Sequence, residues 1–459
     1  METYTLAAHC ALGAEKICAN EIRKLNQSAG SAEDTYTIIE SNWGRVLFST
    51  GLCGIYRALY ALRTADRILL RAAAAPAPDF DALFDMARNA ALEHLLPKNS
   101  AVSIGKVRTK SSALAAQTSI QSVTHKAIAE NLCGAWGLRR LPDAAGAAGS
   151  FEFRVYLEKD TAELYLDICG EPLYKRGYRS IRFTEQEKPP RSATGIDFAD
   201  APLRETTAAA LLLLSNWRRK YPLYDPFCGS GVIAIEAAYF ACNIAPNLRR
   251  SFTLESMPIA DAALAAKVRD ELIAAVCPDA EFSIQGSDSN AAAVSQAKRN
   301  LNAAFEGLPL NPAGLPLFNT LEMEYAKSYR DTPGFIVTNP PWGKRQGTQQ
   351  EAEENYARMS VLRDNFPGWK IAVITSHPGF ESFFGRKADS CAALTNGALE
   401  TFVYQFEGNT NESGVQKSKF RARMSAVART ERTPRNAAQT PPVPQPENGR
   451  RVSKKGYTW

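Results

Sequence analysis

The second half of the chain alternates between strand-like and helix-like patterns, and this alternation restricts its fold more than any other feature. Short apolar runs typical of strands alternate with longer helix-like segments, in the order 222–225, 232–240, 282–288, 291–304, 334–338, 353–363 and 370–376. Such alternation predicts a parallel sheet covered by helices on both faces. Asn396-Gly397 then separates two apolar runs, which is a strong hairpin signal. We therefore predict an α/β fold whose parallel sheet is closed by an antiparallel hairpin.

Composition and pattern divide the chain into five segments. Residues 1–60 and 61–170 combine strands with helices, residues 171–201 are polar with two adjacent prolines, residues 202–409 carry the alternation, and residues 410–459 are basic and proline-rich. We interpret residues 171–201 as a linker. The last segment is predicted to be disordered because it offers few apolar side chains to bury. Two smaller α/β units are therefore expected to precede the larger one.

Composition also excludes several classes of protein. With 45% hydrophobic and 22% charged side chains among 459 residues, the chain is not predicted to be a fibre, a coiled coil or mostly disordered. No apolar run reaches the length of about 20 residues that a membrane span needs, and the start does not resemble a secretion signal. Nine cysteines without a Cys-x-x-Cys pair and four scattered histidines give no reason to expect a disulfide framework or a metal site. We expect a cytoplasmic protein without a membrane or a metal as partner.

Positive charge is concentrated in two zones. The segment 410–459 holds eleven Lys or Arg against three Glu, and the stretch 95–142 is also rich in basic residues. Two separate basic zones favour a polyanionic partner, with nucleic acid as the first candidate. A solvated surface explains the same charges, and charge alone does not decide between the two.

A glycine-containing turn follows the first strand of the alternating half. It reads Asp225-Pro-Phe-Cys-Gly-Ser-Gly231 and leads into an apolar helix. A phosphate-binding loop would require Gly-x-x-x-x-Gly-Lys-Ser/Thr, which the chain lacks. A dinucleotide fingerprint is approached, with Ala234 in place of its last glycine, but an acid before the glycines would repel a pyrophosphate. A serine-hydrolase elbow would require Gly-x-Ser-x-Gly, but position 228, where this motif around Ser230 needs its first glycine, is Cys. The acid at position 225 suits a cationic ligand with an amino-acid moiety.

Two weaker signals follow at later strand ends. Gly286-Ser287-Asp288 closes the next strand, and an acid there can bind the two hydroxyls of a ribose. Asp288 lies farther from the glycines than usual, so an insertion of about residues 243–281 is expected. Taken alone, an acid at position 288 is more often a helix-capping or turn residue than a ribose ligand. Glu322-Met323, after a short strand, carries little weight by itself.

The fourth element is Asn339-Pro340-Pro341-Trp342, directly after the strand 335–338. Two prolines fix the backbone and remove two donors, which leaves carbonyl groups free to accept hydrogen bonds. Asn339 Oδ1 and the Pro340 carbonyl can accept the two N–H bonds of a planar amine, and Trp342 can stack on its ring. The alternative is a rigid loop at a strand end, which the presence of the 225–231 turn in the same sheet makes less attractive.

Together, the 225–231 turn and the 339–342 loop resemble class I S-adenosylmethionine-dependent amino-methyltransferases. Segments 173–179, 201–206 and 243–246 further resemble the THUMP-domain RNA guanine-N2 methyltransferases, above all the bacterial 23S rRNA enzymes; segments 13–15, 62–67 and 111–128 resemble their ferredoxin-like and THUMP parts. The resemblance covers about residues 1–407. It implies a C-terminal Rossmann-like sheet of seven strands with an antiparallel hairpin at 202–409, preceded by a ferredoxin-like domain at 1–60 and a THUMP domain at 61–170.

The resemblance also implies roles for single residues. The methionine end of S-adenosylmethionine would be lined by Asp225, Phe227, Cys228, Gly229 and Gly231, its ribose would be held by Asp288, its adenine would be flanked by Glu322 and Met323, and the target base would be held by Asn339, Pro340, Pro341 and Trp342. Three departures from the family pattern are visible: Trp342 replaces Tyr or Phe, Glu322 replaces the commoner Asp, and extra residues near 181–198 lengthen the linker.

Basic residues are the candidates for contacts with RNA. Those in the basic stretch and at the start of the linker are Lys106, Arg108, Lys110, Lys126, Lys175, Arg176 and Arg179. For each of them an exposed surface charge is the competing interpretation. The predicted partner is RNA, with ribosomal RNA in an assembling particle as one form, and the chain is expected to be a monomer or a weak dimer.

The predicted activity is methylation of the exocyclic N2 amine of a guanine, with 23S rRNA as the first substrate. Three alternatives stay open: a tRNA guanine-N2 methyltransferase, a DNA adenine-N6 or protein glutamine methyltransferase, and a noncatalytic RNA-binding factor in ribosome assembly. The Asn-Pro-Pro-aromatic loop suits all the enzymes among them, and the long N-terminal half favours RNA.

Overall fold

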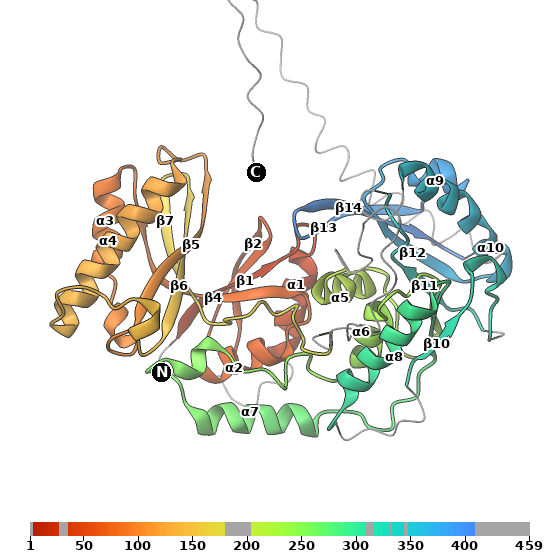
Figure 1. The fold of residues 1–459 in the computed structure, drawn as a ribbon, viewed down its shortest axis with the longest axis horizontal. Coiled ribbons are helices and arrows are strands. Elements are labelled where there is room, and N and C mark those ends of the chain that lie inside the picture. The colour runs from red at the N-terminus through yellow and green to blue at the C-terminus, as the bar shows by residue number, and fades with distance from the viewer. Residues whose placement is uncertain are drawn as a thin grey trace, which may run out of the picture. The chain divides into compact units, whose positions relative to one another are not determined.

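The structure, a computed structural model, describes residues 3–26, 35–179, 203–308, 315–330, 332–343 and 348–408. The predicted disordered segment 410–459 and most of the predicted linker, from residue 180 onward, lie outside these ranges. The described residues form two seven-stranded sheets with their helices (Figure 1).

The N-terminal sheet has the strand order β2-β3-β1-β4-β7-β6-β5. Its strands are β1 (Tyr4–Cys10), β2 (Thr37–Asn42), β3 (Arg45–Thr50), β4 (Ala65–Pro76), β5 (Ala101–Lys110), β6 (Ser150–Glu158) and β7 (Thr161–Asp167). All neighbours are antiparallel except β5 and β6. Its helices are α1 (Glu15–Leu25), α2 (Leu52–Ala61), α3 (Phe80–Arg88) and α4 (Gln117–Trp136). Apolar side chains of these helices and strands share one buried core.

Strand β4 belongs to both halves of this sheet. Its first half pairs with β1, with Leu70 opposite Leu6, and its second half pairs with β7, with Pro76 opposite Thr161. The predicted boundary between residues 60 and 61 therefore falls just before a strand that continues the same sheet. Separate ferredoxin-like and THUMP domains remain a prediction.

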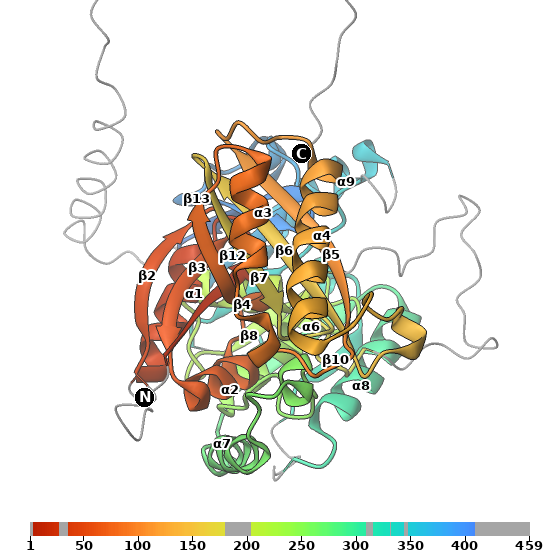
Figure 2. The same ribbon diagram turned by 90° about the vertical axis from the view of Figure 1, so that its left-hand side faces the viewer.

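The N-terminal sheet is strongly bent (Figure 2). Strands β4 and β7 lie between β1 and β6, so β1 and β6 would be roughly 14 Å apart in a flat sheet. The rings of His9 on β1 and Tyr156 on β6 nevertheless have centroids only 5.2 Å apart. Register shifts in β1, β4 and β5 accompany the bend, as expected because extra residues increase local twist.

The C-terminal sheet has the order β10-β9-β8-β11-β12-β14-β13. Its strands are β8 (Leu223–Asp225), β9 (Ile284–Asp288), β10 (Leu317–Thr320), β11 (Phe335–Thr338), β12 (Lys370–Thr375), β13 (Ser390–Asn396) and β14 (Leu399–Phe406). The five strands from β10 to β12 are parallel, and the β13–β14 hairpin adds to β12 in the antiparallel sense. This confirms the predicted α/β fold with its closing hairpin.

Helices cover both faces of the C-terminal sheet. One face packs against α5 (Glu205–Leu214), α6 (Val232–Ala241) and α8 (Ala291–Phe305), and the other against α9 (Gln349–Arg358), α10 (Leu362–Asn365) and α11 (Phe380–Phe384). The predicted helix 353–363 begins earlier, because Thr348 and Glu351 form a capping box, and it is interrupted by a short 3-10 turn. The strand order reverses between β8 and β11, the place where open α/β sheets bind their ligands.

The predicted insertion between α6 and β9 contains a helix of its own, α7 (Ala262–Ala274). This helix packs against α2 of the N-terminal half, where Arg57 Nη2 lies 2.5 Å from Glu271 Oε2 and Arg269 donates to the Tyr60 hydroxyl. Val268 of α7 is fully buried in the N-terminal core. The insertion therefore joins the two sheets.

Candidate active site

Three polar side chains end neighbouring strands at one edge of the C-terminal sheet. Asp288 closes β9, Asp225 closes β8 and Asn339 follows β11, and these strands are adjacent in the order β9-β8-β11. Because all three strands are parallel, their carboxyl ends meet at the same edge. The structure thus brings together the residues that the three separate motifs supplied.

The turn after β8 depends on two glycines in the left-handed region. Gly229 has φ +50° and Gly231, which precedes α6, has φ +82°. A Cβ atom on Gly231 would lie 2.9 Å from the Phe318 ring and 3.0 Å from Ala297 Cβ, whereas one on Gly229 would meet no atom within 4 Å. Gly231 therefore allows tight packing, and Gly229 leaves space beside the backbone for a ligand.

Asp225 is buried and Asp288 is half-buried at this edge, and backbone amides donate to both carboxylates. Asp288 accepts hydrogen bonds from Gly229 N at 3.0 Å and Asn290 N at 2.9 Å, and Asp225 accepts from Thr338 Oγ1 at 2.6 Å and Phe227 N at 3.2 Å. Burial raises the pKa of Asp225 to about 7 despite these bonds, and the charge of Asp288 adds to the increase. Burial also raises the pKa of Asp288.

Within the described ranges, neither carboxylate forms an ion pair with Lys or Arg. A buried and a half-buried acid that lack a cation among the described residues make this edge favourable for a positively charged ligand. Asp225 Oδ1 accepts both of its hydrogen bonds, so its Oδ2 is the oxygen left for a ligand, whereas each Asp288 oxygen accepts one bond and keeps a further lone pair.

The remaining cofactor candidates lie around the same edge. Cys228 is buried, and burial together with the nearby Asp225 raises the pKa of its thiol well above the ordinary value, so the thiol is neutral. Phe227 is half-buried against the core on the α9 side. Met323 is buried just after β10, and the adjoining Leu321 N donates to the Asp288 carbonyl. Glu322 is exposed, with Oε2 3.9 Å from Arg358 Nη2.

The loop after β11 holds an unsatisfied acceptor. Asn339 Oδ1 is buried and accepts no hydrogen bond from any residue that the structure describes. None of the described residues donates to the Pro340 carbonyl either. The next carbonyl, that of Pro341, accepts from the Tyr356 hydroxyl at 3.0 Å, and Trp342 Nε1 donates to the Ile374 carbonyl at 3.2 Å. The loop is thus fixed to α9 and β12 while two acceptors stay free.

Two residues that support this arrangement were not among the predicted ones. Thr338 fixes the Asp225 carboxylate, and its position as a polar residue that ends an apolar strand was a visible signal. Tyr356 bridges the Pro341 carbonyl and the Thr375 hydroxyl from α9. No local pattern in the sequence connects position 356 to the loop, because the contact depends on tertiary packing.

The predicted RNA-contacting residues differ widely in exposure. Lys106, Arg108, Lys126 and Lys175 are exposed, and Lys110 is partly exposed beside Glu158. Lys126 and Lys175 each face a glutamate one helical turn or one loop away, Glu130 and Glu171. Arg179 is mostly buried and donates twice to Glu205, with Nε 2.8 Å from Oε1.

The position of Arg176 does not suit the predicted contact with RNA. Its side chain is buried, and its guanidinium donates to Glu236, to Asn247 and to the carbonyls of Leu173 and Arg63. A buried guanidinium with these acceptors has no edge left for a phosphate. Arg176 instead joins the end of the N-terminal half to α6.

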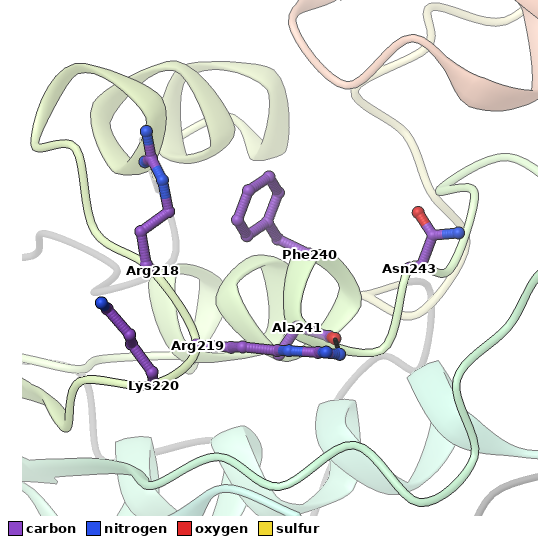
Figure 3. A pocket seen from close by; sticks show the side chains of 6 residues that line it. All are labelled: Arg218, Arg219, Lys220, Phe240, Ala241 and Asn243. Atoms are coloured by element: carbon purple, nitrogen blue, oxygen red, sulfur yellow. Dashed lines mark hydrogen bonds between the residues drawn. The ribbon is translucent and has the colours of Figure 1, made fainter. Parts of the chain in front are cut away.

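A basic pocket of about 450 Å³ lies at the amino edge of the same sheet, opposite the candidate site (Figure 3). Arg218, Arg219 and Lys220, which precede β8, line it together with Phe240, Ala241 and Asn243 at the end of α6. Figure 3 shows Arg219 extended toward Ala241, whose carbonyl accepts its hydrogen bond at 3.4 Å. The sequence analysis did not single out this pocket.

A search of the described ranges finds neither a group of three metal-binding side chains nor a helix long and apolar enough to cross a membrane. The candidate site therefore consists of carboxylates, backbone amides, an amide oxygen and an aromatic ring.

Comparison with known proteins agrees with this geometry. Residues 195–405 match the family model described as "RMKL-like, methyltransferase domain", and residues 5–69 match the "RlmL ferredoxin-like domain". "Putative RNA methyltransferase YpsC" of Bacillus subtilis (strain 168) is 34% identical over 407 residues, which cover 88% of this chain and 96% of that protein. The chain belongs to the RlmKL-like methyltransferases.

Further relatives of this family support the assignment. "Ribosomal RNA large subunit methyltransferase K/L" of Allochromatium vinosum is 30% identical over 85% of this chain but only 50% of its own length, so the chain spans about half of that relative. The solved structure of SMU.472 in complex with SAH is 31% identical, covers 90% of this chain and all of its own, and has a TM-score of 0.74. A Listeria monocytogenes structure, named as a predicted N6-adenine-specific DNA methylase, is 30% identical over 89% of this chain and 97% of its own, with a TM-score of 0.75.

The family and the SAH-bound relative confirm the predicted cofactor, S-adenosylmethionine. The residues present fit it: the open space at Gly229 admits a ligand, and the buried Asp225 and half-buried Asp288, which lack a cationic partner among the described residues, suit a sulfonium with an amino-acid group. This RlmKL-like chain is therefore an S-adenosylmethionine-dependent methyltransferase. The match at residues 5–69 confirms the ferredoxin-like region and extends it into β4.

Proposed function

We propose that this RlmKL-like protein methylates the exocyclic N2 amine of a guanine in RNA, with 23S rRNA as the substrate. The observation that carries the proposal is Asn339 Oδ1, an enclosed acceptor without a donor at the carboxyl edge of the sheet. An amino group on a flat base satisfies it, because such a group offers two N–H donors. The names of the relatives, an RNA methyltransferase and K/L enzymes of the large ribosomal subunit RNA, support RNA as the substrate class.

The cofactor is assigned to the edge formed by β9, β8 and β10. Asp225 and the backbone from Phe227 to Gly231, including Cys228 and Gly229, hold its methionine end; Asp288 holds its ribose; Glu322 and Met323 flank its adenine. The neutral Cys228 thiol adds no competing charge beside the sulfonium. When bound, S-adenosylmethionine supplies a methyl group on a positively charged sulfur.

The loop after β11 is assigned to the target base. Asn339 Oδ1 and the Pro340 carbonyl accept the two N–H bonds of the amine, which aims its lone pair at the methyl group. The same acceptors stabilise the positive charge that develops on the nitrogen, and the extra proton leaves to water. Trp342, held by its bond to the Ile374 carbonyl, stacks on the ring. A base inside a helix cannot reach this loop, so the target is an unpaired or flipped nucleotide.

RNA contacts are assigned to the exposed cations of the N-terminal half. Lys106, Arg108 and Lys110 occupy alternate positions on β5, and Lys126 and Lys175 add charge on α4 and at the start of the linker. Such contacts with phosphates give affinity and salt dependence rather than sequence choice. Arg176 and Arg179 are left out because protein acceptors already occupy their guanidinium groups.

The other substrates are outcomes of one assay. The Listeria relative favours an adenine in DNA as the second candidate, because its name specifies that activity. Purified protein is incubated with tritiated S-adenosylmethionine and with total RNA from cells that lack the gene, with genomic DNA or with ribosomal protein, and the labelled product is identified by mass spectrometry. N2-methylguanosine in 23S rRNA is the expected product. N2-methylguanosine in tRNA, N6-methyladenine or methylglutamine would replace the proposal, and absence of any product would favour an assembly factor without activity.

Asn339→Ala tests the site directly. Because it removes the acceptor that orients the amine, we expect methyl transfer to fall by about two orders of magnitude or more while cofactor binding persists. Single-turnover transfer and calorimetric titration with S-adenosylmethionine give the two readouts. Asn302→Ala, on the exposed face of α8, is the matched control and should leave both unchanged. Wild-type turnover in Asn339→Ala would remove Asn339 from the mechanism.

A further inference from the structure

Trp43 is exposed although it is a large aromatic residue. Its exposed fraction is 54%, whereas Trp217 and Trp369 are 1% and 3% exposed. A buried tryptophan contributes strongly to a core, and an exposed one leaves that contribution unused. The side chain is therefore not at this position for the stability of the fold.

The backbone at Trp43 leads to the same conclusion. Asn42 at the end of β2 pairs with Arg45 at the start of β3, so Trp43 and Gly44 form a two-residue hairpin loop. Their φ angles are +53° and +72°. A loop with two positive φ angles favours Asn-Gly, and a bulky side chain in the left-handed region is strained. Strain of this kind at an exposed aromatic points to a function of the ring.

Positive charge lies against the ring and continues away from it. Lys110 Nζ is 2.9 Å from the centroid of the Trp43 ring, although β5 and β2 are the opposite edges of the sheet. The bend of the sheet brings them together. Lys106 and Arg108 precede Lys110 on alternate positions of β5, and no carboxylate in the described ranges pairs with either of them.

Arg108 lies beside an aromatic cluster of the same sheet, near Arg45 and Arg154, which are paired with carboxylates. The guanidinium of Arg108 lies 5.6 Å from the Tyr156 ring, beside the buried His9. Burial, and after it the charges of Arg108, Arg45, Arg154 and Lys106, lower the pKa of His9 well below its ordinary value. An aromatic plane at the end of a row of cations matches the chemistry of single-stranded nucleic acid, which offers both bases and phosphates.

Hydrogen bonds connect the Trp43 loop to the hairpin beside the carboxyl edge of the C-terminal sheet, the edge that carries Asn339. Cys10 N donates to the Gly44 carbonyl at 2.9 Å, and two residues later Leu12 N donates to Thr395 Oγ1 at 2.9 Å while Thr395 N donates to the Leu12 carbonyl. Thr395 belongs to the β13–β14 hairpin, whose turn extends past the carboxyl end of β12. The loop is thus joined through residues 10–12 to the hairpin that borders the edge carrying Asn339.

We infer that Trp43 is a stacking platform for one unpaired base of single-stranded RNA, and that Lys106, Arg108 and Lys110 hold the phosphates of the nucleotides beside it. The inference rests on RNA as the substrate class in the proposed function and adds where a single-stranded stretch is held. Because every base has an aromatic face, the platform accepts any base and supplies affinity without choosing sequence.

The test measures binding of a short fluorescein-labelled oligouridylate to the full chain by fluorescence anisotropy. Trp43→Asn removes the ring and creates the Asn-Gly pair that the turn prefers, so we expect binding about tenfold weaker at an equal or higher melting temperature. Trp43→Phe keeps an aromatic face and should retain most of the affinity. Ile39→Asn is the matched control, because Ile39 on the same hairpin is 52% exposed. It should bind like wild type.

The outcomes separate this inference from the proposed function. Unchanged oligouridylate binding in Trp43→Asn, together with weaker binding in a variant that lacks the β5 cations, would overturn the platform and leave RNA binding intact. Equal losses in Trp43→Asn and Ile39→Asn would also overturn it, since the effect would then belong to the hairpin as a whole. Wild-type protein that binds neither oligouridylate nor ribosomal RNA would remove both the platform and RNA as the substrate class.

Discussion

Asp225, which we propose binds the cofactor, is also expected to affect the stability of the protein. Its carboxyl group is 1% exposed, and burial raises its pKa to about 7. In the unfolded chain an aspartate has a pKa of about 3.9, so between pH 4 and 7 the unfolded chain has lost a proton that the folded protein keeps. The contribution of Asp225 to the free energy of unfolding therefore falls as pH rises through this window and is constant above it.

Asp225→Asn should stabilise the ligand-free protein but weaken its binding of S-adenosylmethionine. At pH 8 the ligand-free variant should melt at a higher temperature than wild type. The difference should shrink toward pH 4, where the Asp225 carboxyl of wild type is protonated in the folded protein and about half protonated in the unfolded chain. Its affinity for S-adenosylmethionine should fall by about tenfold, because a hydrogen bond from a cationic group to a charged acceptor is lost. Calorimetry at both pH values measures both effects, and Asp270→Asn on the exposed face of α7 is the control. A variant that melts lower than wild type at pH 8 would contradict the burial argument.

Helix α7, which belongs to the C-terminal half, packs against α2 and so connects the two halves of the protein. Tyr56 on α2 accepts a hydrogen bond from Asp261 N at 3.0 Å, and Val268 reaches the core under α2. The charged contacts of the helix are partly exposed, so the apolar contact is expected to dominate its contribution.

Val268→Ala should therefore lower the free energy of unfolding by about 2 kcal/mol, since it removes two buried methyl groups and leaves a small cavity. Urea denaturation followed by circular dichroism measures the change. The neighbouring Lys267→Ala, exposed on the same helix, should have little effect. Equal stability of the two variants would mean that α7 is only loosely attached.

The sequence predicts the elements of the C-terminal sheet well because their signals are local. Apolar strands such as 335–338, the Asn-Gly pair of the hairpin and the glycines at 229 and 231 each constrain their own backbone. Helix α7 was missed because its small side chains give only a weak apolar stripe and its partner, α2, lies far away in the sequence. The buried state of Arg176 was missed for the same reason, since its acceptors come from α6 and from residues 63 and 247.

On the scale of the whole molecule, we expect the salt dependence of RNA binding to come from the cations of β5. A variant carrying Lys106→Ala, Arg108→Ala and Lys110→Ala should bind RNA more weakly, and its plot of log affinity against log salt should be flatter by about two units, because each lost phosphate contact on a single strand contributes about 0.7. Filter binding over a salt series measures the slope.

The basic pocket offers a control of equal charge. A second triple variant, with Arg218→Ala, Arg219→Ala and Lys220→Ala, also loses three cations. These lie at the amino edge of the C-terminal sheet, away from the carboxyl edge that carries Asn339. This variant should keep the wild-type slope. Equal slopes for the two triple variants would show that binding follows net charge rather than the β5 surface.

The long strand β4, of twelve residues, limits where recombination can divide the gene of such a protein. The first half of β4 pairs with β1 and the second half pairs with β7. A recombination point within β4 would therefore leave each product with an unpaired strand edge. Gene fusion or exchange would have to carry the first 170 or so residues as one unit, and the rest of the chain would have to supply α7 to pack against α2.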